Sequence, residues 1–213
     1  SLECTPEIFD ERWRDRVRGR RKTMGPMATE DEPEANDTPG ARDRRAIRNE
    51  ADPKVLAAKV RALGELTDKK TIPVVIDVME RNSDLVRETA FVTLLKTKDT
   101  ECLDVIWNYG LSHADGVVRA YTAKLCGRLN LEFAVAKLEA QLEDRNWYAR
   151  AEAAVALALL KDVKAMAGLR RIVASDPSEK TQVGAMDALA MLGEDAAMAV
   201  PLIVEKCCDV DGA

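Results

Sequence analysis

The sequence predicts an all-α protein: an α-solenoid of about five two-helix repeats that follows a non-repeating N-terminal extension. A row of apolar residues recurs at a step of 31 or 32 positions, at Leu63, Leu94, Cys126, Leu157 and Leu189. A second row keeps the same steps, at Ile72, Leu103, Val135, Met166 and Met198. Aromatic residues are only 4% of the chain, so alanine and leucine, which are the best helix formers, dominate the predicted core.

The extension covers residues 1–51 and begins with a predicted basic amphipathic helix. Thr5 is followed by a proline and a glutamate, which is a strong helix start. One narrow apolar stripe follows among many arginines, at Phe9, Trp13 and Val17. The chain begins with serine, and we hypothesise that translation starts at Met24 or Met27.

The rest of the extension leads into the repeats. Residues 28–40 are acidic and contain prolines, a composition that cannot bury a core and that predicts a linker. A short charged helix is expected over residues 41–51. The repeat array is then predicted from about residue 52 to residue 208, with a short tail at 209–213.

Each repeat is predicted to consist of two antiparallel helices. In the first, Asp52-Pro53 opens a helix that extends to Leu66, and a second helix covers residues 71–81. The later repeats are expected at 83–112, 114–143, 145–175 and 177–208. Capping residues recur where the repeats join, at Ser83, Asp115, Asp144 and Asp176. A mostly acidic column marks the start of each second helix, where a carboxylate can accept free N–H groups, at Asp68, Asp99, Asp162 and Glu194.

Composition excludes several classes of protein. The net charge is −5, so the whole molecule does not match the electrostatics of a nucleic-acid binder. The five cysteines include no CxxC spacing, which argues against a disulfide framework and a zinc site and favours a reducing compartment, most simply the cytoplasm. No apolar run approaches the length of a membrane-spanning helix.

The first helices carry a repeated signature, an apolar–arginine pair followed by alanine and leucine. It stands at Val86-Arg87 with Ala90 and Leu94, and at Ala149-Arg150 with Ala153 and Leu157. In the third repeat Val118-Arg119 fits, but Cys126 takes the place of the leucine. With these residues most of the chain resembles the short HEAT repeats first noticed in phycobilisome lyase subunits. The resemblance implies an α-solenoid, a fold that serves many unrelated roles.

Arg87, Arg119 and Arg150 form a row along successive first helices. The resemblance implies that such arginines pair with acids in neighbouring repeats, so we interpret them as a structural ladder. An anion-binding stripe is the functional alternative. His113, the only histidine, lies at a join between repeats, where a loop role is favoured over catalysis. A single histidine also excludes the iron-dependent HEAT-repeat hydroxylases, which carry paired His-Glu motifs.

Second helices line the inner curve of HEAT-like arrays, so their solvent-facing residues are the candidates for contact with a partner. These residues change from acidic to basic along the array, at Asp77, Glu80, Asp104, Asn108, Lys137, Gln141, Arg170 and Arg171. A graded surface could steer a protein partner, whereas a nucleic-acid backbone requires one sign throughout. Simple solvation of these side chains is the plain alternative. At most one of Trp107 and Tyr109 should face the core, and we expect Tyr109 or Trp147 to be a contact residue.

The sequence therefore predicts a non-enzymatic scaffold or adaptor that binds a protein partner along its concave face, with no cofactor and no metal. The candidate contact residues are Trp107, Tyr109, Lys137, Gln141, Trp147, Arg170 and Arg171. One alternative, from the resemblance, is a bilin-lyase-like subunit of an enzyme that attaches or detaches a chromophore. Another is a nucleic-acid-binding HEAT-like protein, although no nucleic-acid contact is expected. Membrane-surface contact through the N-terminal helix is a less favoured hypothesis.

Overall fold

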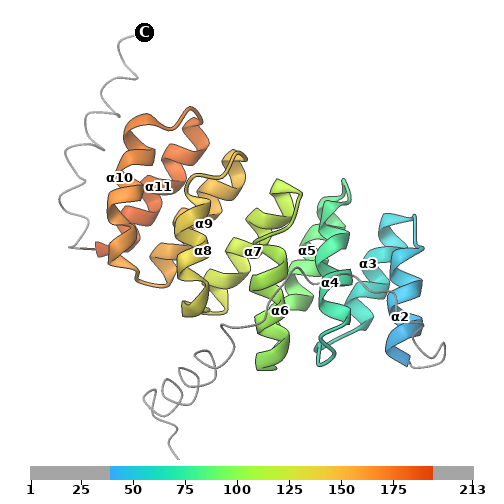
Figure 1. Cartoon of the computed structure of the whole chain (residues 1–213). Coiled ribbons are helices and arrows are strands. Elements are labelled where there is room, and N and C mark those ends of the chain that lie inside the picture. Colours follow the sequence, from blue (N-terminus) through green and yellow to red (C-terminus); the bar gives the residue numbers. More distant parts are fainter. Residues whose placement is uncertain (1–38, 194–213) are drawn as a thin grey trace, which may run out of the picture. The chain divides into compact units, whose positions relative to one another are not determined.

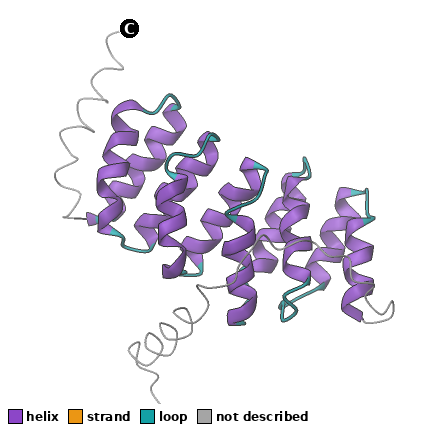
Figure 2. Cartoon of the chain, viewed as in Figure 1, coloured by secondary structure: helices purple, strands orange, loops and turns teal. Residues whose placement is uncertain are grey.

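A computed structural model describes residues 39–193 of the chain, and every regular element in that range is a helix (Figures 1 and 2). The α-helices are α2 (Pro39–Arg48), α3 (Pro53–Ala62), α4 (Thr71–Asp77), α5 (Asp84–Leu94), α6 (Thr100–Gly110), α7 (Gly116–Arg128), α8 (Val135–Gln141), α9 (Trp147–Leu159), α10 (Met166–Ser175) and α11 (Glu179–Met191). Three 3-10 helices adjoin the second helices: η1 (Val78–Glu80), η2 (Glu132–Ala134) and η3 (Val163–Ala165). The predicted all-α class is confirmed.

The helices from α3 onward form the predicted repeats. The pairs α3–α4, α5–α6, α7–α8 and α9–α10 are the first four repeats, and α11 is the first helix of the fifth. First helices pack on first helices, as α7 does on α9 and α9 on α11, while α4 packs on α6. The second helix of the fifth repeat and the predicted helix after Thr5 lie outside the described residues. No helix among those described is long and apolar enough to cross a bilayer.

Helix α2 lies within the range that the sequence assigns to the extension, yet it packs against α3 and α4. Its Ile47 is 1% exposed and joins the core of the first repeats. Its Arg44 forms an ion pair with Asp68, and its Nη1 also donates to Thr71 Oγ1 at 3.3 Å. The packed part of the chain therefore begins before residue 52, because one apolar side and one buried arginine tie α2 to the first repeat.

The acidic column acts at the start of the second helices. Asp99 caps α6, because its carboxylate accepts the N–H groups of Glu101 and Cys102 at 3.0 Å. Asp68 and Asp162 each accept the N–H two residues further on. First helices are capped in the same way where Asp52, Asp115 and Asn146 precede them. Ser83, in contrast, makes no capping hydrogen bond with its side chain.

The leucine row forms the core from the second repeat onward. Leu94, Cys126, Leu157 and Leu189 are all fully buried. Leu63 is only half-buried and lies just after α3, which ends at Ala62. The buried side chains form two clusters, one reaching from Ile47 to Leu125 and the other from Leu111 to Leu189. Both clusters draw residues from α7, so the two cores meet at the first helix of the third repeat.

Candidate functional site

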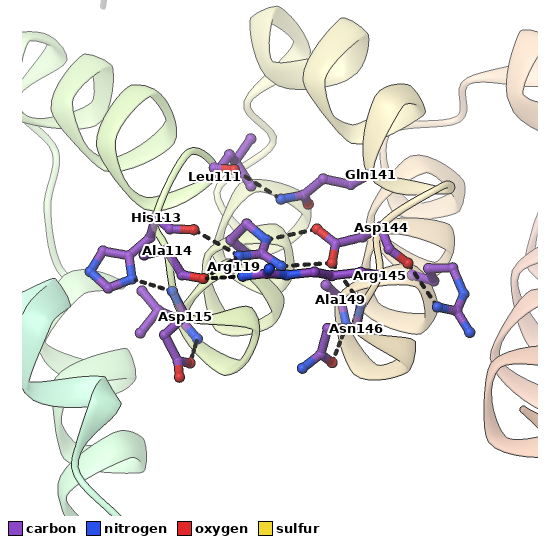
Figure 3. Close-up of polar contacts among 12 residues, drawn as sticks. Leu111, His113, Ala114, Asp115, Arg119, Gln141, Asp144, Arg145, Asn146 and Ala149 are labelled. Carbon is purple, nitrogen blue, oxygen red and sulfur yellow. Dashed lines mark hydrogen bonds and ion pairs between the residues drawn. The ribbon is translucent and has the colours of Figure 1, made fainter. Parts of the chain in front are cut away.

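The clearest polar feature is an ion pair that joins the third repeat to the fourth (Figure 3). Arg119 of α7 donates from Nε and Nη2 to the two carboxylate oxygens of Asp144, each at 2.7 Å. Its Nη1 donates to the carbonyls of His113 and Ala114 at 2.8 Å. Both side chains are about nine-tenths buried, so this bidentate pair is a fixed part of the fold.

The charge state of this pair follows from its hydrogen bonds. Burial alone would raise the pKa of Asp144, but the bonds from Arg119 and from the Asn146 N–H outweigh it and hold that pKa below the ordinary value. The bond to Asp144 in turn raises the pKa of Arg119. Each partner thus stabilises the charged form of the other.

The same pair recurs at the next join. Arg150 of α9 donates from Nε and Nη2 to Asp176, at 2.6 and 2.8 Å, and from Nη1 to the carbonyl of Asp144 at 2.7 Å. Each aspartate also closes a turn, because Asp144 accepts the N–H of Asn146 at 2.8 Å and Asp176 that of Ser178 at 2.9 Å. These two aspartates therefore fasten the preceding repeat and shape the start of the following one.

Arg87 does not make the corresponding bond to the next repeat, which corrects the prediction of a three-member ladder. Its Nε donates to the carbonyl of Met79 at 3.1 Å and its Nη1 to Asp84, in its own helix, at 3.0 Å. The partner aspartates lie 25 or 26 residues after their arginines. The residue 26 positions after Arg87 is His113, not an acid. Within residues 39–193, the ladder therefore consists of two ion pairs, Arg119–Asp144 and Arg150–Asp176.

On the second-helix side, several candidate contact residues bind the neighbouring repeat. The Tyr109 hydroxyl donates to Asp77 at 2.7 Å, and burial, followed by this bond, raises the pKa of Tyr109. Lys137 donates to Ser112 Oγ at 3.0 Å and to the carbonyl of Asn108 at 3.2 Å, while its Nζ lies 4.9 Å from the centre of the Trp107 ring. Burial lowers the pKa of Lys137. These side chains tie repeats together.

Gln141 and Trp107 also differ from their predicted positions. The sequence places Gln141 on the outward face, but it is 6% exposed and donates to the carbonyl of Leu111 at 3.1 Å. Trp107 packs on Phe133, with ring centres 5.6 Å apart, and both belong to the rim of the second core. Tyr109 is half-buried against the first core, so both aromatic residues face a core, although not the same one.

Within residues 39–193, the large apolar residues that remain exposed lie on first helices. They are Val55, Leu85, Val92, Trp147, Val183 and Met191. Trp147 opens α9, as predicted, and is 40% exposed, with Lys180 Nζ 5.1 Å from its ring centre. Of the candidate residues, Trp147 therefore offers the largest open apolar surface.

Two basic candidates lie on α10, and one of them, Arg171, lines a cavity of about 270 Å³ between the third and fourth repeats. Arg171 forms an exposed ion pair with Glu143, and both residues line the cavity. Arg170 is half-buried, and its Nε makes no hydrogen bond. The other residues lining the cavity are Leu142, Asp144, Arg150, Ile172, Ser175, Asp176 and Pro177.

A run of aromatic rings on the first helices was missed by the sequence analysis. Phe91, Tyr121 and Tyr148 lie with successive ring centres 6.1 Å apart, and Trp147 follows at 5.5 Å. Lys124 places its Nζ 5.0 Å from the Phe91 ring. These residues do not share a repeat column, so comparison by period alone cannot find them. A search for aromatic residues near one another on consecutive first helices would have done so.

The described side chains form no group of three or more histidine, cysteine, aspartate or glutamate residues arranged to hold a metal ion. A family model described as HEAT repeats matches residues 44–121 and 107–190. The match is to HEAT repeats in general and does not extend to the lyase-associated type. No curated protein matches the chain significantly.

Proposed function

We propose that this chain, which belongs to the HEAT-repeat family, is a non-enzymatic scaffold that binds another protein at the cavity between its third and fourth repeats. The observation that carries this proposal is that one cavity is lined by two ion pairs, one of them buried and the other exposed. HEAT repeats generally act as interaction scaffolds, and a polar cavity bounded by neighbouring helix pairs gives a partner a defined place to dock.

The buried ion pair provides the rigid part of the proposed site. Arg150 and Asp176 are joined by two hydrogen bonds, and their side chains are 11% and 5% exposed. Breaking such a pair would leave a charge buried without a partner, which is costly. Arg150 and Asp176 are therefore already fixed before a partner binds, so these two side chains lose little conformational entropy on binding.

The exposed ion pair provides the adaptable part. Arg171 and Glu143 are 61% and 64% exposed, so their attraction is screened by water and contributes at most about 1 kcal/mol. The pair can separate at small cost and present a guanidinium and a carboxylate to a partner. A segment that carries an oppositely charged pair of side chains would replace both interactions. Trp147 does not line the cavity, but it is exposed at the start of α9 and could serve as a separate aromatic contact.

The test is a charge reversal at the exposed pair. Arg171→Glu places like charges together and removes the guanidinium, so we expect loss of the proteins that the unaltered chain captures from a lysate of its source cells. Lys164→Glu is the matched control, because Lys164 is also exposed and basic and precedes the same helix. Capture by the Lys164→Glu variant should equal that of the unaltered chain. Equal capture by the Arg171→Glu variant would overturn the proposal.

No feature of residues 39–193 specifically favours a lyase subunit or a nucleic-acid binder. A bilin-binding subunit would show visible absorbance after co-expression with its partner, and a nucleic-acid binder would show affinity that falls with salt. Either result would replace the scaffold proposal.

A further inference from the structure

The join between the second and third repeats differs from the next two joins in the kind of side chain that closes its turn. Asp144 and Asp176 each accept the N–H of the residue two positions on, and His113 takes this role through a ring nitrogen. Its Nδ1 accepts the N–H of Asp115 at 3.1 Å (Figure 3). The turn that begins the third repeat is thus closed by the only side chain in the sequence that ordinarily changes charge near neutral pH.

The other ring nitrogen faces acids of the first repeat. His113 Nε2 lies 3.3 Å from Glu80 Oε1 and 3.6 Å from Asp77 Oδ1. Because Nδ1 accepts a hydrogen bond, the neutral ring carries its proton on Nε2, where it points toward these carboxylates. The side chain is 9% exposed, so its interactions are with the protein more than with water.

The charged and titratable groups around the ring come from several elements. Asp77 and Glu80 approach from α4 and η1, and Tyr109 of α6 packs its ring edge-on at 5.7 Å and donates to Asp77. On the other side, Arg119 binds the carbonyls of His113 and Ala114. The remaining charged neighbours are Asp115, which caps α7, Arg145, which donates to Ala114, and Arg48, which acts on Tyr109.

These surroundings make opposite demands on the two nitrogens. A second proton on the ring strengthens the attraction between Nε2 and the carboxylates of Glu80 and Asp77. The same proton turns Nδ1 into a donor, and two donors cannot share the bond from Asp115 N–H. Protonation therefore breaks the hydrogen bond that closes the turn before the third repeat and strengthens the contact of the ring with the carboxylates of the first repeat. Neither Asp144 nor Asp176 faces this exchange, since a carboxylate accepts whenever it is ionised.

The join is also where packing changes along the array. Helix α7 packs extensively along α9 but only sparsely along α5, and it also contacts α6 and η1. The two hydrophobic clusters meet at α7. A weakened turn at this join therefore acts where first helices pack sparsely on one another.

We propose that His113 makes this join proton-sensitive: protonation releases the Asp115 N–H while the ring stays held by Glu80 and Asp77, and so weakens the turn between the second and third repeats. This inference does not depend on the proposed binding cavity.

The first test is the tautomer of the neutral ring. Because the sequence contains one histidine, its ring nitrogens can be assigned without ambiguity by long-range proton–nitrogen NMR of the labelled chain. We expect the proton on Nε2 at about pH 8. A proton on Nδ1 would show that Asp115 N–H is not bound by the ring and would overturn the proposal.

The second test is amide hydrogen exchange at two equivalent positions. The Asp115 N–H binds His113, and the Asn146 N–H binds Asp144 in the same kind of turn, so Asn146 is an internal control. After correction for intrinsic rates, lowering the pH from about 8 to about 5 should speed exchange at Asp115 roughly fivefold relative to Asn146. Equal responses at the two amides would contradict the proposal.

A variant separates protonation of the ring from other effects of acid. His113→Asn keeps an oxygen that can accept the Asp115 N–H but cannot titrate, so the difference between the two amides should no longer change with pH. A pH response equal to that of the unaltered chain would assign the effect to another group. Should this variant not fold, the tautomer and the exchange of the unaltered chain still decide the question.

Discussion

Gly127 of α7 lies so close to α9 that a Cβ atom on it would stand 2.9 Å from the Cα of Ala156. This distance is shorter than real Cβ contacts, and the atom in the way belongs to the backbone, which cannot rotate aside. The close packing of α7 on α9 at this point therefore depends on a missing side chain.

Replacing Gly127 by alanine tests this dependence, because helix propensity and overpacking predict changes of opposite sign in the free energy of unfolding. Helix propensity alone predicts that Gly127→Ala stabilises the chain by up to about 1 kcal/mol. Overpacking predicts a net loss of about 1–3 kcal/mol, because α7 and α9 must separate. We expect the loss, measured as a lower free energy of unfolding in urea. Arg128→Ala, at the next and exposed position, should change stability by less than about 0.5 kcal/mol. A stabilised Gly127→Ala variant would contradict the close packing.

Neighbouring acids at one join allow a second comparison. Asp144 is buried and paired with Arg119, whereas Glu143 is exposed and paired with Arg171. Asp144→Ala leaves the Arg119 guanidinium buried without its carboxylate, so we expect a loss of about 3–5 kcal/mol in the free energy of unfolding. Glu143→Ala should cost less than about 1 kcal/mol. Similar losses from the two substitutions would show that the bidentate pair is not the main tie between these repeats.

The repeat columns predicted the core because burial imposes the same demand in every repeat. Leu94, Cys126 and Leu157 are buried at equivalent places, and the period alone identified them. The family resemblance, not the period, implied acid partners for Arg119 and Arg150, and their partners are aspartates that the sequence marked only as capping residues.

Features that break the period could not be predicted in this way. Gln141 points inward and donates to the carbonyl of Leu111 in the preceding repeat, a contact that no repeat column indicates. Arg87 pairs only within its own helix and lacks the ion pair to the following repeat, because His113 stands at the position of the partner aspartate. That position can be recognised only once the other two pairs are known. The run from Phe91 to Tyr148 crosses the columns diagonally, so the aromatic contacts emerge from the packing of the helices.

Burial also determines the reactivity of two thiols. Burial, followed by the charge of Asp99, raises the pKa of Cys102 to about 11, and burial raises that of Cys126 to about 12. The thiolate is the reactive form, so both residues should resist iodoacetamide at about pH 8 in the folded chain. Peptide mass mapping should find them modified only after unfolding in urea. Modification of folded Cys126 at the rate of the unfolded chain would show that α7 opens readily to solvent.

The two buried ion pairs predict how stability depends on pH. Burial raises the pKa values of Asp144 and Asp176, but the hydrogen bonds from Arg119 and Arg150 outweigh it. Both pKa values therefore lie below the ordinary value of 3.8. A depressed pKa in the folded state means that the unfolded chain takes up protons first. The stabilisation from these carboxylates is therefore present above the unfolded value and is lost as the pH falls through the folded one.

We accordingly expect the urea midpoint to fall as the pH is lowered from about 5 to about 2, and to fall less in a chain that carries Asp144→Asn with Asp176→Asn. That double variant begins from a lower midpoint at neutral pH, because amides cannot form ion pairs with Arg119 and Arg150. Asp84→Asn is the matched control: Asp84 is exposed, so its replacement should leave the slope unchanged. A double variant with the full acid dependence of the unaltered chain would place the responsible carboxylates elsewhere, and the ladder would then have no part in acid unfolding.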